Sequence, residues 1–344
     1  MRKSVRYILI AVCFISTAVI LIMTLRPANH AKPVEEEPSE KQAATAEPVS
    51  KETPVPTLKP ETKNESLFKE MQSSIITGEG IKMGFYVIGH AYGTPENLAD
   101  GIHEPVQAYL DGVMRNELLD FGVFTGDIVC EGKEQEFADF KTALDATGKR
   151  WYVAPGNHDA NSVELFEEYI GQNYGYFVEQ DNLFIYLDCV ERWDIPDAQL
   201  DMMHTALAQN KDVDNIFVFT HQLNWWDPDA KEFEGFSPNS TYEYDAENKP
   251  NFYSDVLPLF NMLGENIYFI AGDTGAFPNG YEIYYRQDGR FTYIASGVGG
   301  SVKDSAIEFY IMESGDVYIN LVALNGAAPN ALGSITDYTW YTVQ

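Results

Sequence analysis

The stretch that most constrains this chain is Gly156-Asn157-His158-Asp159, which directly follows the short apolar run 151–153. Such a run is typical of a buried strand, so these residues would present polar side chains at the edge of a sheet. The glycine allows a sharp turn, the Asn157 amide oxygen can bind a hard cation, and the His158 imidazole can meet an anionic substrate. The stretch therefore predicts a site, provided that neighbouring strands contribute further polar groups.

Four other apolar runs end in the same manner. They end in Gly89-His90, Gly126-Asp127, His221 and Gly272-Asp273-Thr274-Gly275. In open α/β sheets, ligands bind beyond the carboxyl ends of the strands, so these groups can meet at one place. One such strand end would be weak evidence, whereas five together predict a shared site with metal-binding or acid–base residues.

The net charge of −29 restricts the kind of partner. Nucleic acids and anionic membrane surfaces need basic patches on the protein, so neither is expected as the main partner. Most of the acidic excess lies beyond residue 64. There it favours solubility and would concentrate divalent cations.

Residues 8–25 form an apolar run without a charged residue, flanked by basic residues on both sides. At about 1.5 Å per residue this run is long enough to span a bilayer. The basic flank places the N-terminus in the cytoplasm and the rest of the chain outside. We therefore expect one uncleaved transmembrane helix within residues 1–26, with a cleaved signal peptide as the alternative.

The chain after this run divides into a tether and a folded domain. Residues 27–64 are rich in Pro, Glu and Lys and almost free of large apolar residues, which predicts a disordered tether. Residues 65–344 alternate strand-like and helix-like segments, which is typical of α/β proteins with mixed or parallel sheets. Strands are expected at 83–88, 123–125, 151–154, 183–187, 216–220 and 267–271, and helices at 96–119, 134–146, 163–169 and 197–208.

Three features of the domain leave alternatives open. Two hairpin-like pairs, 281–295 and 307–322, are expected to complete a second sheet. The aromatic insertion 224–250 predicts either a substrate-binding loop or a surface cover packed by its own aromatic rings. Cys130 and Cys189 could pair in an oxidising compartment or stay free.

Taken together, the five strand-end motifs resemble the calcineurin-like metallophosphoesterase family, in order and spacing, over nearly all of residues 80–300. The resemblance implies an α/β fold, a four-layer α/β/β/α sandwich of two mixed sheets with helices outside. It also implies a metal site at the strand ends between the sheets.

In that family the Asp of the Gly-Asp motif bridges two metal ions, and here it is Asp127. The second ion would also take Asn157, His221 and Asp273, the last in a place where the family has a histidine. These donors favour Mn²⁺, Fe²⁺ or Mg²⁺ over Zn²⁺.

The first ion would keep only His90 besides the bridging aspartate, because Ile88 and Gly275 stand in its two other ligand places. Two protein ligands seldom hold a metal alone, so we expect about one divalent ion per chain. On the same grounds, the double change Ile88→Asp and Gly275→His should admit a second ion.

The expected catalytic residues are His158, His90 and Asp159, with His158 stabilising charge or protonating the leaving oxygen. The chain is thus expected to be a membrane-anchored, extracytoplasmic phosphoesterase that acts on a small or envelope-linked phosphoester. One alternative is a non-catalytic binding protein for a phosphorylated or sugar ligand. Another is a hydrolase or transferase of envelope glycans.

Overall fold

The computed structural model describes residues 77–94, 102–261, 263–276, 282–325 and 331–339. The expected anchor, residues 1–26, and the expected tether, residues 27–64, lie outside these ranges. Within them, no helix is long and apolar enough to cross a membrane.

The first sheet is mixed and has five strands in the order β11-β10-β1-β2-β3. Strands β1, β2 and β3 are parallel, and β10 runs antiparallel to both β1 and β11. The strands are β1 (Ile81–Ile88), β2 (Phe121–Thr125), β3 (Arg150–Ala154), β10 (Ser305–Met312) and β11 (Val317–Ala323).

The second sheet is also mixed, with six strands in the order β4-β5-β6-β7-β9-β8. Its four central strands are parallel, and β4 and β8 are antiparallel edges. The strands are β4 (Gly175–Glu179), β5 (Asn182–Tyr186), β6 (Asn215–Thr220), β7 (Asn266–Ala271), β8 (Ile283–Asp288) and β9 (Phe291–Ser296).

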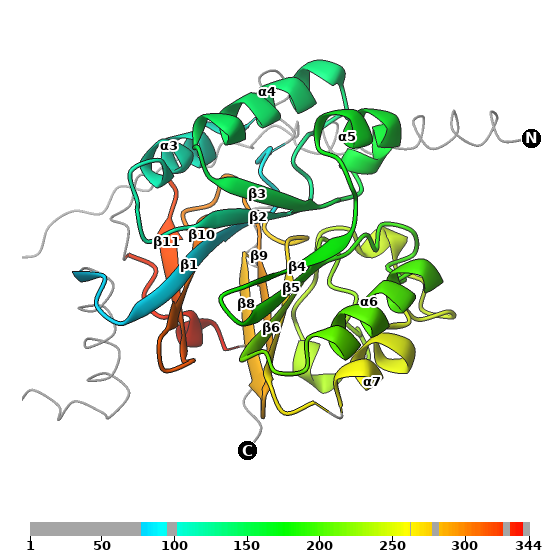
Figure 1. The fold of residues 1–344 in the computed structure, drawn as a ribbon. Coiled ribbons are helices and arrows are strands. Elements are labelled where there is room, and N and C mark those ends of the chain that lie inside the picture. The colour runs from blue at the N-terminus through cyan, green and yellow to red at the C-terminus, as the bar shows by residue number, and fades with distance from the viewer. Residues whose placement is uncertain (1–76, 95–101, 262, 277–281, 326–330, 340–344) are drawn as a thin grey trace, which may run out of the picture. The chain divides into compact units, whose positions relative to one another are not determined.

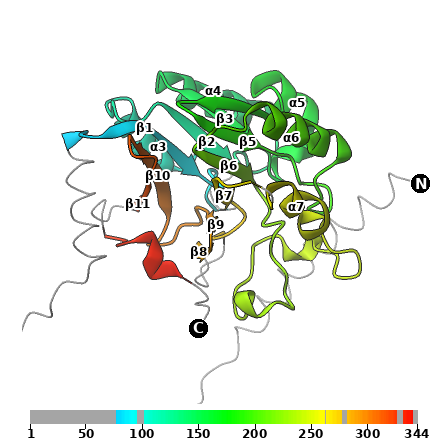
Figure 2. The same ribbon diagram turned by 60° about the horizontal axis from the view of Figure 1, so that its bottom comes forward.

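Helices lie on the outer face of each sheet (Figure 1). The first sheet carries α3 (Glu104–Val113), α4 (Glu134–Ala146) and α5 (Val163–Tyr169), and the second carries α6 (Asp197–Gln209) and α7 (Leu257–Phe260). In the turned view, α4 and α5 lie at the top and α7 lies below them, while α6 is seen next to α5 (Figure 2). The apolar positions of α4 explain its orientation, because Phe137, Phe140 and Leu144 recur on one helical face and are buried.

The space between the sheets is filled by apolar side chains from both. Phe85 of β1 lies at its centre, with its ring centroid 4.6 Å from that of Phe309 in the same sheet and 5.0 Å from that of Phe217 in the opposite sheet. Burying one such side chain contributes roughly 1.5–3 kcal/mol. This layer holds the carboxyl ends of the parallel strands of both sheets at a fixed separation.

Most expected elements are present, and the helices 134–146 and 163–169 have the predicted bounds. The expected helix 96–119 is shorter, since α3 ends at Val113 and residues 95–101 lie outside the described ranges. Cys130 and Cys189 are both free and buried, so these two cysteines form no disulfide with each other.

The placement of the second C-terminal hairpin was wrong. Only β8 and β9 join the second sheet, whereas β10 and β11 extend the first, with Phe309 of β10 opposite Phe85 of β1. The reason is that β1 is paired with β2 on one side only, so its other edge needs a partner for its backbone groups. Turn residues identify a hairpin, but they do not say which sheet edge it completes.

Candidate functional site

The five predicted strand ends converge on Asp127. His90 follows β1, Asp127 follows β2, and the motif 156–159 follows β3 in the first sheet, while His221 and Asp273 follow β6 and β7 in the second. The two sheets are joined here directly, because His221 Nδ1 donates to the Thr125 carbonyl oxygen at 2.8 Å.

The Asp127 carboxylate lies between two imidazole rings and is only 2% exposed. Its Oδ2 is 3.2 Å from His221 Nε2 and 3.5 Å from His90 Nε2. Its Oδ1 accepts the backbone N–H of His158 at 3.0 Å. The predicted bridging residue therefore contacts residues from both halves of the site.

Strained turns place these groups. His90 and Asp127 have φ values of 57° and 52°, in the left-handed region that non-glycine residues seldom adopt. Such strain is found mainly at functional sites, where the surrounding structure holds it. Gly156 is equally constrained, because a Cβ atom there would lie 2.2 Å from Asp127 Oδ1.

Backbone carbonyls fix the orientation of both histidines. Nδ1 of His90 donates to the Val298 carbonyl at 2.9 Å, as Nδ1 of His221 does to Thr125. In the neutral ring, Nε2 then carries a lone pair that faces the Asp127 carboxylate. The two Nε2 lone pairs and the carboxylate oxygen are all acceptors, so a cation is needed between them. A ring whose Nδ1–H donates to a backbone carbonyl is typical of metal-binding histidines.

Electrostatics distinguish the two rings. Burial lowers the pKa of His90 to about 4, so this ring is neutral at pH 7. Burial also opposes a charge on His221, but the Asp127 carboxylate outweighs it and raises the pKa of His221 to about 10. Without a bound ion, the charge of Asp127 is thus balanced by a proton on His221.

Asn157 and Asp273 complete the predicted ligand set. Asn157 Oδ1 is buried and has no hydrogen-bond partner in the described part of the chain. Asp273 Oδ1 lies 3.7 Å from His221 Nε2, while its Oδ2 accepts both the backbone N–H and the hydroxyl of Ser240. Burial raises the pKa of Asp273 to about 7.

The predicted ligands contact one another in pairs, but their side chains do not surround a common position for an ion. Among the described residues, no group of three or more His, Cys, Asp and Glu side chains could hold a metal ion as it stands. The donor types nevertheless suit a divalent cation, and Asn157 Oδ1 and His221 Nε2 are buried without a well-aligned hydrogen bond to any described residue. An ion would have to draw these atoms together.

His158 is half-buried at the edge of this cluster. Its Nδ1 donates to the Cys130 carbonyl at 2.5 Å, and its Nε2 lies 3.3 Å from the Tyr92 hydroxyl. The Tyr92 ring also packs against His90, with centroids 4.3 Å apart. Tyr92 was missed from the sequence, although it stands only two residues after His90.

The position of Asp159 does not suit the catalytic role expected of it. Its carboxylate is fully buried and accepts the backbone N–H groups of Ile128, Val129 and Gly156 at 2.8–3.2 Å. These bonds tie the turn after β2 to the turn after β3. We therefore assign Asp159 a positioning role instead of the expected catalytic one.

The two positions that lack a ligand are closed by their surroundings. Ile88 is 1% exposed and packs in the apolar cluster between the first sheet and its helices. Gly275 has φ 85°, and a Cβ atom there would lie 2.5 Å from the Gly297 carbonyl oxygen. The expectation that Ile88→Asp with Gly275→His would admit a second ion stays a prediction, and a side chain at Gly275 would require the backbone there to shift.

The aromatic insertion is in part a packed cover, and the substrate-binding alternative stays a prediction for the turn that follows. Trp225, Trp226, Phe233 and Phe236 are buried in the core of the second sheet, as a packed cover requires. The following turn reaches the site, where Ser240 bonds Asp273 and the Tyr242 hydroxyl lies 3.4 Å from Asn157 Nδ2.

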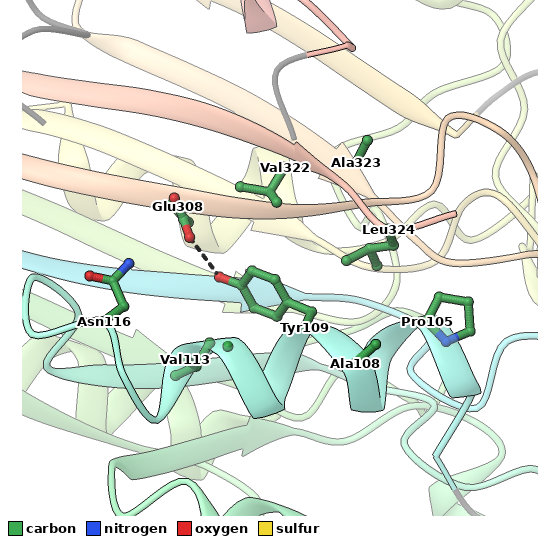
Figure 3. A pocket seen from close by; sticks show the side chains of 10 residues that line it. Pro105, Ala108, Tyr109, Val113, Asn116, Glu308, Val322, Ala323 and Leu324 are labelled. Carbon is green, nitrogen blue, oxygen red and sulfur yellow. Dashed lines mark hydrogen bonds between the residues drawn. The ribbon is translucent and has the colours of Figure 1, made fainter. Parts of the chain in front are cut away.

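A cavity of about 360 Å³ lies elsewhere, between α3 and strands β10 and β11 (Figure 3). Tyr109 in its wall donates a hydrogen bond to Glu308 at 3.0 Å. None of the predicted site residues lines this cavity. The polar strand-end cluster, and not this cavity, is the candidate active site.

Comparison with known families agrees with this assignment. Residues 90–254 match the family model of the calcineurin-like phosphoesterases, a range that contains Asp127, the motif 156–159 and His221. This match agrees with the resemblance that the strand-end motifs carry. Phosphoesterases of this family use divalent metal ions.

Similarity to individual proteins is more limited. The chain is 35% identical over 69 residues to a probable glycerophosphodiester phosphodiesterase of Arcobacter nitrofigilis, across 20% of this chain and 24% of that protein. The match thus spans about a quarter of the relative's length. Two structures of a cold-active protein-tyrosine phosphatase, one of them from a psychrophilic Shewanella species, are each 10% identical and cover 69% of this chain. The matches span 80% and 78% of the phosphatase chains, with TM-scores of 0.30 and 0.29.

Proposed function

We propose that this protein is a metal-dependent phosphoesterase that hydrolyses a small or envelope-linked phosphoester. The observation that carries the proposal is the convergence of His90 and His221 on the buried Asp127 carboxylate. All three residues lie within the range 90–254, which matches the family model of the calcineurin-like phosphoesterases.

The proposed ion is held on the His221 side of the cluster, by Asp127, Asn157, His221 and Asp273. The buried oxygen of Asn157, which has no hydrogen-bond partner within the described ranges, supports this choice. When bound, a divalent ion supplies positive charge to a phosphate oxygen and lowers the pKa of a water molecule.

The remaining groups handle protons and orientation. Nδ1–H of His158 is engaged with the Cys130 carbonyl, so Nε2 is the nitrogen that can exchange a proton with the leaving oxygen. Tyr92, 3.3 Å from that nitrogen, holds the ring in place. Asp159 keeps the two turns that carry Asp127 and His158 together.

We further propose that the apolar run 8–25 anchors the protein in a membrane with the domain outside the cytoplasm. The length of the run and its basic flanks support this. A C-terminal tag should be digested by protease added to intact cells from which any outer layer has been removed. Protection of the tag until the cells are lysed would refute the proposed location. It would leave the proposed phosphoesterase activity unaffected.

The chemistry is tested with the full-length protein in mild detergent. Generic aryl phosphomonoesters and phosphodiesters should be hydrolysed in the presence of Mn²⁺, Fe²⁺, Mg²⁺ or Zn²⁺, and a chelator should stop the reaction. Turnover that follows metal content would support an enzyme. A protein that binds metal but turns over none of these esters would favour the binding-protein alternative.

A further inference from the structure

The turn Thr241–Glu243 of the insertion is fastened to the strand end that carries Asp273. Ser240 donates its backbone N–H to Asp273 Oδ2 at 3.1 Å and its hydroxyl to the same oxygen. The backbone N–H of Asn239 donates to the Asp273 carbonyl at 3.0 Å, and that of Glu243 to the Ser240 carbonyl at 2.9 Å. The backbone position of Glu243 is therefore fixed by these hydrogen bonds to Ser240 and, through it, to Asp273.

Glu243 brings a carboxylate to the cluster, where it has a side-chain hydrogen bond with Tyr242. Its Oε2 is buried and has no hydrogen-bond partner within the described ranges. The charged groups that act on it are His221, Asp127 and His158.

Two buried acceptor atoms from two different segments thus have no hydrogen-bond partner among the described residues. They are Glu243 Oε2 and Asn157 Oδ1. The Tyr242 hydroxyl, 3.4 Å from Asn157 Nδ2, shows that the turn lies beside the motif that follows β3. A divalent cation can satisfy both acceptor atoms, since carboxylate and amide oxygens are among its usual ligands.

We propose that Glu243 is a ligand of the divalent ion, contributed by the aromatic insertion in addition to the strand-end residues. This rests on the proposed metal-dependent function and extends it. The closed position at Gly275 removes one donor from the strand ends, and Glu243 supplies an anionic oxygen from outside them. With this oxygen the set becomes richer in carboxylates, which favours Mn²⁺ or Mg²⁺ over softer ions.

The test is Mn²⁺ binding by isothermal titration calorimetry to the full-length protein in mild detergent. Glu243→Gln keeps the shape of the side chain and removes its charge, and Glu247→Gln makes the same change at an exposed residue of the same insertion. We expect Glu243→Gln to raise the Kd at least about tenfold, as loss of a group that supports a metal site typically does, and Glu247→Gln to leave it unchanged.

Thermal melting separates ligation from a structural role. In a chelator, Glu243→Gln should melt at the wild-type temperature or above it, because it removes an unpaired buried charge. With Mn²⁺ added, the variant should gain less in Tm than the wild type. A variant that melts lower in chelator and gains as much from Mn²⁺ would show a structural role and overturn the proposal.

The outcomes also separate this proposal from the proposed function. Equal Mn²⁺ affinity in Glu243→Gln and wild type would overturn the role of Glu243 and leave the metal site in place. A wild-type protein that binds no divalent ion would overturn both.

Discussion

The two sides of Asp127 are built differently. On the His221 side, the strand ends and the insertion bring an amide and two further carboxylates to the cluster. On the His90 side, the ring meets Asp127 and the Val298 carbonyl, while Ile88 is packed in the core and Gly275 leaves no room for a side chain. The difference between the two sides is that only the His221 side has enough donors for an ion, so we expect one ion per chain.

The largest expected effect is that of Asp127→Ala, because this residue serves both sides. We expect metal affinity to fall by at least about 100-fold and phosphoesterase activity to vanish. Calorimetry and elemental analysis measure the first, and an aryl phosphate assay measures the second. Asp145→Ala, on the exposed face of α4, is the control and should retain both. Retention of the ion by Asp127→Ala would mean that Asp127 is not an essential metal ligand of the cluster.

His221→Ala and His90→Ala probe the two sides separately. His221→Ala should lose the ion nearly as completely as Asp127→Ala, whereas His90→Ala should change the Kd by no more than a few fold. The reason is that only the His221 side has enough donors. Titration of both variants with Mn²⁺ measures the two Kd values. Equal losses of affinity would show that the two sides of Asp127 contribute equally to ion binding.

His158→Ala should separate catalysis from binding. Because the His158 ring is held by the Cys130 carbonyl and the Tyr92 hydroxyl, the variant should keep its ion and lose roughly 10²- to 10⁴-fold in kcat, the range for a general acid. Elemental analysis and kinetics are run on the same preparation. Loss of the ion would show that His158 is itself a ligand.

The smallest effect expected is on stability, at the closed position of the His90 side. Gly275→Ala should destabilise the fold by about 1–3 kcal/mol, because its φ of 85° and the carbonyl 2.5 Å from the new Cβ atom strain the backbone. Gly315→Ala, at the similar φ of 86° but with no atom within 4 Å of the new Cβ, is the matched control and should cost less. Urea denaturation compares the two, and equal costs would show that the contact with Gly297 is unimportant.

Much of the strand-end cluster could be predicted because its signals are local. Buried parallel strands read as apolar runs, and the glycines before Asp127 and Asn157 mark turns at their ends. The positions of those residues at one edge then follow from the behaviour of parallel sheets.

The parts that could not be predicted depend on contacts between distant segments. Glu243 and Ser240 lie in an insertion whose backbone follows no periodic pattern, and only the bond to Asp273 places them. The role of Asp159 depends on backbone N–H groups about 30 residues away. The hairpin β10–β11 joins the sheet that has a free edge, which turn residues do not encode.

The most direct test of a one-ion site is the metal content of the full-length protein. The protein is loaded with Mn²⁺, freed of unbound ion by gel filtration, and measured by elemental analysis against protein concentration. We predict about one ion per chain in the wild type and none in His221→Ala. Two ions per chain, or one ion that survives His221→Ala and is lost in His90→Ala, would contradict the account.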